Sequence, residues 1–283
     1  MRSIPFTKMS GVGNDFIIVD NRSGILSAIG AGEFARRVCT RRLSLGGDEL
    51  MLIEAPRAGG AFSMRTINPD GTEVKMCGNA SRCVARYAHT HGIAGARMTI
   101  DTLGGPVEAW VDGDEVRVRL QLTSRIVLDH PLTVDGERYV VHSVEVSGAP
   151  HAVVYLKDVA DASSDFIHRL GGAIRHHADF PQGINVNFVQ ALDAHALWQR
   201  TFERGVEGET LACGTGAAAS SAVGCLLGSV DTPVRVRVLG GELSISFARR
   251  GDAFEELFLG GGARFVAEGV LHPEAWSWQP SGA

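Results

Sequence analysis

The feature that most constrains this 283-residue sequence is an internal repeat. The segments "EVKMCGNASRCVARYAHTHG" (73–92) and "ETLACGTGAAASSAVGCLLG" (209–228) share a glutamate, a Cys-Gly pair and a final glycine in register. Each shared residue recurs 136 positions later, as Cys77 does at Cys213. The same offset joins "LGG" at 103 to "LGG" at 239, each followed by alternating apolar residues. Agreement over such a length indicates two copies of one structural design.

Each copy is predicted to hold a helix directly after its Cys-Gly pair. In the first copy the apolar residues recur at the spacing of one buried helix face, Arg82 and Arg86 lie off that face, and Gly92 is a suitable stop. The second copy has no polar stripe stronger than serine, so we expect its helix to be surrounded by sheet on every side. The apolar residues of the first helix are Ala80, Cys83, Val84, Tyr87 and Ala88.

Short alternating runs with glycine turns fill the rest of both halves, which predicts largely antiparallel sheet. The expected fold class is α+β, with two pseudo-symmetric domains, each a curved, mainly antiparallel sheet wrapped around a central helix. We expect an N-terminal lobe over 1–120 and a C-terminal lobe over 121–263, with 264–283 packed back on the first lobe. The boundary is placed where "QLTSRIVLDHPL" breaks the rhythm of strands and turns.

Composition excludes several classes of protein. The net charge of -5 is mild and no basic run is longer than an arginine pair, which argues against nucleic acid or an anionic membrane as a partner. Residues 211–230 carry no charge, but glycine, alanine, serine and threonine dominate them, so a buried helix is favoured over a membrane span. The first residues lack the apolar core of a signal peptide, which favours the cytoplasm.

The cysteines favour free thiols over disulfides or a metal site. Five cysteines form an odd set, and no pair has CxxC spacing. The ten histidines are scattered, so no metal site is expected. Three of the cysteines lack the repeated context and are assigned to the core. These are Cys39, Cys83 and Cys225.

Cys77 and Cys213 are candidates for paired acid/base chemistry. A cysteine just before a helix lies near unpaired backbone N–H groups and the positive end of the helix dipole, which should lower its pKa. The neighbouring glycines leave those N–H groups open to a carboxylate. If the two halves face each other, one thiolate could remove a proton from a carbon next to a carboxylate while the other thiol delivers a proton to the opposite face. No cofactor is needed for this scheme, and no lysine stands in a Schiff-base setting.

On these motifs the chain resembles the diaminopimelate epimerases, a family of amino-acid racemases that work without pyridoxal phosphate. The resemblance implies an isomerase that interconverts LL- and meso-diaminopimelate for lysine and cell-wall synthesis, with a small-molecule amino-acid substrate and a homodimeric assembly. It covers nearly the whole chain and rests on "GVGNDFIIVD" (11–20), "INPDGTEVKMCGNASRC" (67–83), "GAPH" (148–151), "FPQGINVNFV" (180–189) and "ERGVEGETLACGTG" (203–216).

The resemblance also implies roles for individual residues. Cys77 and Cys213 match the two catalytic acid/base residues, and His151 and Glu203 match residues beside the thiols. Other positions match residues whose backbone holds the reacting carboxylate, namely Gly78, Asn79, Gly214 and Thr215. A further set matches residues that hold the amino and carboxylate groups, including the distal centre, namely Asn14, Asn68, Asn185, Glu203 and Arg204. Two positions depart from the family pattern near the substrate: Ala149, where many members have Asn, and Glu49, where some have Gln.

Alternatives remain at this stage. A related racemase of another amino acid, such as histidine, could use the same cysteines with a changed distal pocket. The thiols could instead form a redox pair, or the chain could be a non-catalytic amino-acid-binding module. Asn68 in "NPDG" and Asn14 beside Gly13 could each serve only as turn residues.

Overall fold

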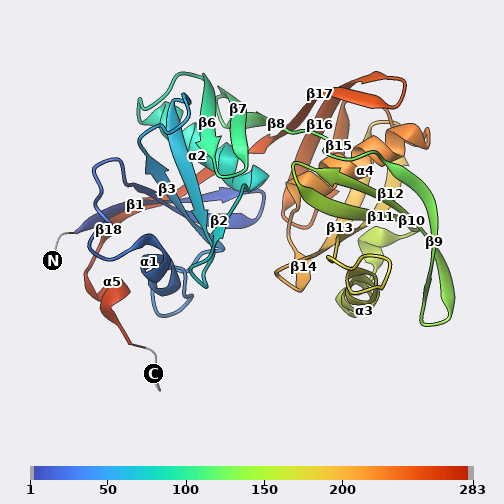
Figure 1. The fold of residues 1–283 in the computed structure, drawn as a ribbon, viewed down its shortest axis with the longest axis horizontal. Coiled ribbons are helices and arrows are strands. Elements are labelled where there is room, and N and C mark those ends of the chain that lie inside the picture. Colours follow the sequence, from blue (N-terminus) through green and yellow to red (C-terminus); the bar gives the residue numbers. More distant parts are fainter. Residues whose placement is uncertain (1–2, 280–283) are drawn as a thin grey trace. The chain divides into compact units, whose positions relative to one another are not determined.

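The computed structural model describes residues 3–279, which divide into two compact units. Unit 1 comprises the chain up to Val118 together with the segment from Gly262 onward, and unit 2 comprises Arg119–Gly261. Each unit is a mixed sheet with few helices, drawn in Figure 1. The predicted α+β class is therefore confirmed.

Unit 1 contains a sheet in the order β18, β1, β2, β3, β4, β6, β7, β8. The short strand β5 also pairs with β4. Its elements are β1 (Ile4–Gly11), β2 (Asn14–Asp20), α1 (Ala31–Val38), β3 (Glu49–Glu54), β4 (Phe62–Ile67), β5 (Glu73–Val74), α2 (Gly78–Thr90), β6 (Arg97–Thr102), β7 (Gly105–Asp112), β8 (Glu115–Arg119), β18 (Arg264–Leu271) and α5 (Glu274–Ser277).

Unit 2 repeats this arrangement in the order β9, β10, β11, β12, β13, β15, β16, β17, with β14 paired to β13. Its elements are β9 (Val127–Val134), β10 (Glu137–Val146), β11 (Ala149–Tyr155), a 3-10 turn η1 (Val159–Asp161), α3 (Ser164–Arg175), β12 (Asn185–Asp193), β13 (Ala196–Glu203), β14 (Gly208–Thr210), α4 (Gly214–Leu226), β15 (Val234–Val238), β16 (Gly241–Arg250) and β17 (Ala253–Gly262).

Strand directions follow from the helices that connect them. Most pairs are antiparallel, as predicted, but β2–β3 and β4–β6 in unit 1 are parallel, as are β11–β12 and β13–β15 in unit 2. Parallel neighbours need a long crossover connection, and each of these pairs has a helix between its strands in the chain. The crossovers α2 and α4 are the two helices that follow the repeated Cys-Gly pairs.

The helices α2 and α4 lie inside the curve of their sheets. Helix α2 contacts β1, β2, β3, β4 and β7, and α4 contacts β10 to β13, β15 and β16. Every residue of α4 from Gly216 to Cys225 is buried, which confirms the expectation of a helix covered on all sides. Its glycine, alanine and serine side chains are small enough for strands to approach from several directions.

The sequence interpretation of α2 was wrong at Arg82. We expected this arginine off the buried face, but it is fully buried, because the sheet of unit 1 encloses the helix more completely than an amphipathic pattern predicts. The predicted face is otherwise confirmed, since Ala80, Cys83, Val84, Tyr87 and Ala88 are all buried. Cys39, Cys83 and Cys225 are buried free thiols, as predicted.

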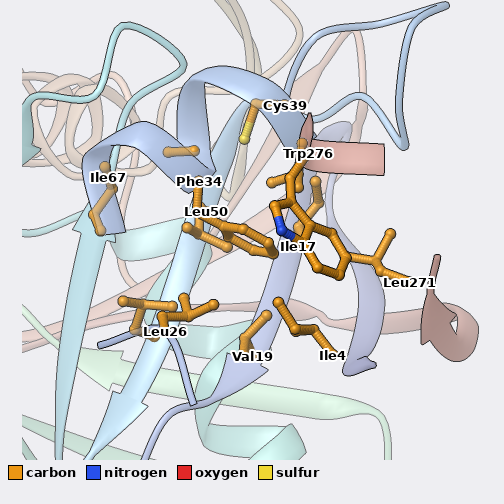
Figure 2. Close-up of a cluster of buried hydrophobic side chains, with 13 residues drawn as sticks. Ile4, Ile17, Val19, Leu26, Phe34, Cys39, Leu50, Ile67, Leu271 and Trp276 are labelled. Atoms are coloured by element: carbon orange, nitrogen blue, oxygen red, sulfur yellow. The ribbon is translucent and has the colours of Figure 1, made fainter. Parts of the chain in front are cut away.

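A second core layer covers the outer face of the sheet in unit 1 (Figure 2). Helix α1 and the C-terminal α5 pack together, and the rings of Phe34 and Trp276 lie 5.7 Å apart between their centroids. Residues from β1, β2 and β3 complete this layer, including Ile4, Ile17 and Leu50. In unit 2, α3 takes the corresponding place against β12 and β13.

Several elements were missed by the sequence interpretation. The strands β1, β9 and β18 and the helices α1 and α3 were not anticipated, and β9 begins within the segment that we assigned to the boundary. Strand β18 lacks a clear alternation because most of its side chains are exposed. Within residues 3–279, no helix has both the length and the apolar character needed to cross a membrane.

The C-terminal segment should contribute strongly to stability. Trp276→Ala is expected to lower the free energy of unfolding by about 3 kcal/mol, because it removes a large buried side chain from the layer between α1 and the sheet. Urea unfolding followed by circular dichroism measures the change. The half-buried Trp278, whose ring lies 5.1 Å from the Arg37 guanidinium, is the control, and its change to alanine should cost less. An equal or smaller loss for Trp276→Ala would contradict the assignment.

Candidate active site at two helix N-termini

The two repeated cysteines have the same local geometry. Cys77 is the N-cap of α2 with φ -130° and ψ 121°, and Cys213 is the N-cap of α4 with φ -124° and ψ 107°. Neither side chain caps its helix, and neither helix has an acidic residue in its first turn. The positive end of each helix dipole is therefore not offset by a carboxylate of its own first turn, which suits the binding of an anion.

A matched ion pair holds the segment before each cysteine. In unit 1, Arg65 of β4 contacts Glu73 of β5 at 2.8 Å, and in unit 2, Arg200 of β13 contacts Glu209 of β14 at 2.7 Å. Each glutamate precedes its cysteine by the same interval in the repeat. The Arg200–Glu209 pair is almost completely buried, so loss of either partner would leave an uncompensated charge. These pairs explain the shared glutamate that opens each copy.

In unit 1, an amide network connects the start of α2 to β2. Asn79 Nδ2 donates to Asn14 Oδ1 at 2.5 Å, and Arg82 Nη1 donates to Asn79 Oδ1 at 3.0 Å. The Nε and Nη2 atoms of Arg82 are buried and have no hydrogen-bond partner within residues 3–279. Burial lowers the pKa of Arg82, while the sulfurs of Cys83 and Cys77 act in the opposite direction. A buried cation therefore lies within electrostatic range of Cys77.

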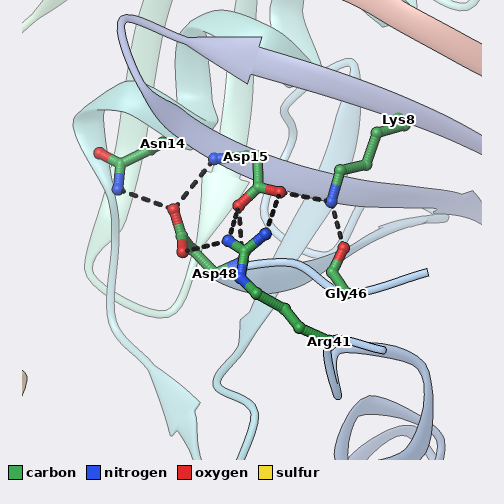
Figure 3. A network of polar contacts seen from close by, with 6 residues as sticks. All are labelled: Lys8, Asn14, Asp15, Arg41, Gly46 and Asp48. Atoms are coloured by element: carbon green, nitrogen blue, oxygen red, sulfur yellow. Dashed lines mark hydrogen bonds and ion pairs between the residues drawn. The ribbon is translucent and has the colours of Figure 1, made fainter. Parts of the chain in front are cut away.

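Asn14 is held from its other side by a charged cluster, shown in Figure 3. Its Nδ2 donates to Asp48 Oδ2 at 3.2 Å, and Asp48 also accepts from Arg41 at 3.0 Å. Arg41 and Lys8 both contact Asp15, at 2.5 and 2.6 Å. Burial alone would raise the pKa of Asp15, but these two cations hold it below its usual value. The cluster holds the start of β2, where Asn14 is the first residue.

Two other candidates of unit 1 lie in different settings. Glu49 is the first residue of β3, in register with Phe16 of β2. Asn68 lies in the turn after β4, where its backbone N–H donates to the Thr72 carbonyl at 2.8 Å and its Nδ2 donates to Thr72 Oγ1 at 3.1 Å. Both hydrogen bonds lie within the turn, which is the pattern expected of a turn residue.

In unit 2, Asn185 lies next to two of the other predicted residues, His151 and Arg204. It lies opposite His151 in the parallel β11–β12 pair, its Nδ2 donates to the Pro150 carbonyl at 3.0 Å, and its Oδ1 accepts the Arg204 backbone N–H at 2.9 Å. The Arg204 guanidinium contacts the Gln182 carbonyl at 3.3 Å. Ala149 begins β11, two residues before His151, and offers no polar side chain.

The environment of Cys213 corrects one expectation. Its sulfur lies 3.7 Å from Thr215 Oγ1, and the backbone N–H groups of Thr215 and Gly216 act to lower its pKa, as predicted. Burial outweighs them, and with the charge of Glu203 it raises the pKa of Cys213 to about 12. The expected low pKa is therefore wrong for this thiol. Burial removes more solvation energy from the thiolate than the backbone N–H groups of the helix start give back as stabilisation.

His151 approaches Cys213 through Thr215. The ring is completely buried, with Nε2 3.0 Å from Thr215 Oγ1 and Nδ1 3.2 Å from Asn187 Nδ2. Burial, followed by the charge of Arg204, lowers the pKa of His151 to about 3, so the ring is neutral at pH 7. The sequence interpretation missed Asn187, although "NVN" puts it on the same strand face as Asn185, two residues away.

Solved structures share this fold at low sequence identity. A Bacillus anthracis phenazine biosynthesis protein of the PhzF family matches with a TM-score of 0.72 and 15% identity, covering 96% of this chain and 100% of that one. A probable proline racemase from Agrobacterium radiobacter K84 matches with a TM-score of 0.70 and 16% identity, covering 98% and 97%. This chain therefore has the fold that is shared by the PhzF-family protein and the probable proline racemase.

The family follows from closer relatives. The sequence profile described as diaminopimelate epimerase matches residues 6–125 and 144–266. A diaminopimelate epimerase of Aquifex aeolicus is 40% identical over 280 residues, covering 95% of this chain and 98% of that protein. One of Methanothrix thermoacetophila is 38% identical over 286 residues, covering 97% and 98%. The chain belongs to the diaminopimelate epimerase family.

Gly216 is required by close packing at the start of α4. A Cβ at this position would lie 2.2 Å from Asn187 Oδ1 and 3.2 Å from Cys213 Sγ. We expect Gly216→Ala to lower the free energy of unfolding by about 1 to 3 kcal/mol, as overpacking does, and to displace the sulfur. Gly172→Ala in α3, where the nearest atom is 3.8 Å away, should be neutral or stabilising. Thermal unfolding of both variants measures this, and unchanged stability of Gly216→Ala would contradict the packing argument.

The buried thiols should make stability fall in alkaline solution. Burial raises the pKa of Cys39, Cys83 and Cys213 from 9.0 to about 12. The unfolded chain loses these protons above about pH 9 while the folded chain keeps them, so the free energy of unfolding should fall between about pH 9 and 12, by at most about 1.4 kcal/mol per pH unit for each thiol. Urea titrations across this range measure the slope. Cys83→Ala should make the slope shallower, and an unchanged slope would count against the burial effect.

Proposed function

We propose that this chain interconverts LL- and meso-diaminopimelate by proton transfer at the alpha carbon between two cysteines. The observation that carries the proposal is the matched Cys-Gly helix start in each unit, with the same extended N-cap conformation at Cys77 and Cys213. Membership of the family supports the substrate, since the Aquifex and Methanothrix relatives bear the name diaminopimelate epimerase. The alternative functions have no comparable support from the relatives. These alternatives are a histidine racemase, a redox pair and a binding module.

The proposed reaction removes a proton from one face of the alpha carbon and adds a proton to the opposite face. One cysteine, as thiolate, takes the alpha proton, and the electron pair of the broken C–H bond delocalises into the adjacent carboxylate. The other thiol then gives its proton to the opposite face, so thiol and thiolate exchange places and the configuration is inverted. The backbone N–H groups at Gly78, Asn79, Gly214 and Thr215 would stabilise the developing charge, with such donors contributing about 3 to 4 kcal/mol each.

The resting protonation state of Cys213 follows from its environment. Because its pKa is about 12, Cys213 is a thiol at neutral pH and is ready to serve as the acid. We propose Cys77 as the base of the first turnover, and the buried cation of Arg82, which lies within electrostatic range of Cys77, supports this choice. After that turnover the roles are reversed, and Cys213 must act as the base for the return reaction.

The remaining candidates are proposed to hold the ends of the substrate. Arg204 would bind the distal carboxylate through its planar fork, and Asn14, Asn68 and Asn185 would bind amino and carboxylate groups. Glu203 and Glu49 would contact ammonium groups. With alanine at position 149, one amide contact to the distal centre is absent from the proposed set, which would weaken selectivity by about 1 kcal/mol.

We also propose a domain division, a location and an assembly. The two compact units would be the two domains of the enzyme. The cytoplasm is the proposed location, because two-thiol chemistry requires reduced sulfurs and a reducing compartment keeps them so. A homodimer is the proposed assembly, supported by exposed apolar side chains on β18, where Val266 and Val270 are 58% and 61% exposed.

Incorporation of deuterium from heavy water tests the function. With LL-diaminopimelate, the wild-type chain should exchange the alpha proton and form the meso isomer, and Cys77→Ala or Cys213→Ala should lower the rate about a thousandfold or more. Cys225→Ala, also in α4 but outside the proposed chemistry, is the matched control and should keep the rate. Exchange of L-histidine in place of diaminopimelate would reassign the substrate, and exchange of neither would reject the proposal.

A further inference from the structure

A chain of buried polar side chains lies beneath the start of α4 in unit 2. At its centre, Asn187 of β12 is completely buried. Its Nδ2 donates to the Ala152 carbonyl at 2.9 Å, and its Oδ1 accepts from Thr201 Oγ1 at 3.0 Å. A carbonyl oxygen can only accept and an amide nitrogen can only donate, so these two contacts fix which way the Asn187 amide faces.

The hydrogen bonds that lead to Asn187 from Gln199 and Thr201 all run in the same direction, from donor to acceptor toward Asn187. Gln199, 1% exposed, donates from Nε2 to Thr201 Oγ1 at 3.1 Å and also lies 3.5 Å from the Cys213 carbonyl. The Thr201 oxygen therefore accepts one hydrogen bond, and its own proton is directed at Asn187 Oδ1. Each of these groups donates a hydrogen bond to the next one in the series, and such aligned bonds hold the side chains in place. The Oε1 atom of Gln199, at the start of the series, is buried and has no hydrogen-bond partner within residues 3–279.

This amide orientation selects one tautomer of His151. Asn187 Nδ2, a donor, faces His151 Nδ1 at 3.2 Å, so Nδ1 must be the acceptor and the ring proton must lie on Nε2. The Nε2–H then donates to Thr215 Oγ1 at 3.0 Å. With its oxygen accepting from the histidine, the Thr215 hydroxyl has its proton left for the Cys213 sulfur, 3.7 Å away.

We propose that Asn187 is a positioning residue for the epimerase reaction: it holds neutral His151 in the Nε2–H tautomer, so that the Thr215 hydroxyl proton is aimed at the sulfur of Cys213. This role rests on the proposed function. An O–H directed at the sulfur stabilises the thiolate in the half of the cycle in which Cys213 acts as base. It also fixes the side chain of Thr215 in the first turn of α4.

The packing around Asn187 leaves little freedom for another arrangement. Its Oδ1 lies close to Gly216, and a Cβ atom added at Gly216 would be only 2.2 Å from this oxygen. His151 is surrounded by protein and carries no charge at pH 7, so one ring nitrogen can accept a hydrogen bond while the other donates one. The sulfur, the hydroxyl, the imidazole and the amide thus form one connected unit joining β11, β12 and α4.

The tautomer can be measured directly by nitrogen-15 NMR of histidine-labelled protein at pH 7, with the His151 signals assigned from a His151→Gln sample. The wild-type chain should show a neutral ring with its proton on Nε2. In Asn187→Asp a carboxylate replaces the donating amide, so Nδ1 should become protonated. A wild-type ring with its proton on Nδ1 would overturn the proposal, whatever the activity of the protein.

The same variant, Asn187→Asp, also provides a kinetic test. Asn187→Asp should lower kcat for LL-diaminopimelate by on the order of a hundredfold with little change in KM, because the sulfur and hydroxyl are misaligned while the substrate contacts remain. Gln190→Glu makes the same chemical change three positions along β12, on the opposite strand face, and should keep kcat within about twofold of the wild type.

The outcomes separate the two proposals. Wild-type kcat in Asn187→Asp, with the Nε2–H tautomer retained, would overturn the positioning role while the epimerase function stands. Absence of exchange by the wild-type chain would overturn the function, and the wild-type tautomer would still decide the arrangement around His151. If Asn187→Asp does not fold, Asn187→Ser removes the donor without adding charge and should give a mixture of tautomers. An unchanged Nε2–H population in that variant would reject the role.

Discussion

The whole arrangement depends on burying one helix inside a curved sheet in each unit. A helix in that position begins inside the protein, so its first backbone N–H groups have no partners from the helix itself. The sequence meets this requirement by placing an extended cysteine at the N-cap and glycine directly after it, at Cys77 and at Cys213. The strands that enclose the helix exclude water, so any anion bound by those N–H groups interacts with them strongly.

Burial and neighbouring charges set the electrostatics of Cys213, and the charge near Cys77 is of the opposite sign. At Cys213, loss of solvation together with the Glu203 carboxylate outweighs the helix start and keeps the sulfur protonated. Beside Cys77, the nearby buried group is the cation of Arg82. One helix start therefore has an acidic neighbour and the other a basic one, although the backbone around them is repeated.

Apart from the matched arginine–glutamate pairs, the two units support their helix starts with different side chains. In unit 1, a cluster of Lys8, Asp15, Arg41 and Asp48 holds the start of β2 at Asn14, which in turn contacts Asn79. In unit 2, the corresponding side chains are neutral: the hydrogen-bonded series runs through Gln199, Thr201, Asn187, His151 and Thr215. The backbone arrangement is thus repeated in the two units, whereas the polar side chains around the helix starts differ.

The sequence by itself determined the repeat, the two helices after the Cys-Gly pairs, the largely antiparallel sheets and the family motifs. These depend on local spacing and on residues close together in the chain. It could not determine that Arg82 is buried, that the pKa of Cys213 is raised, or that Asn187 joins His151 to the sulfur. Each of these depends on which strands enclose a helix and on contacts between residues distant in the chain, such as Asn187 with Thr201 and Thr215 with His151. Solvation and hydrogen-bond direction are properties of that enclosure, so only the tertiary structure decided them.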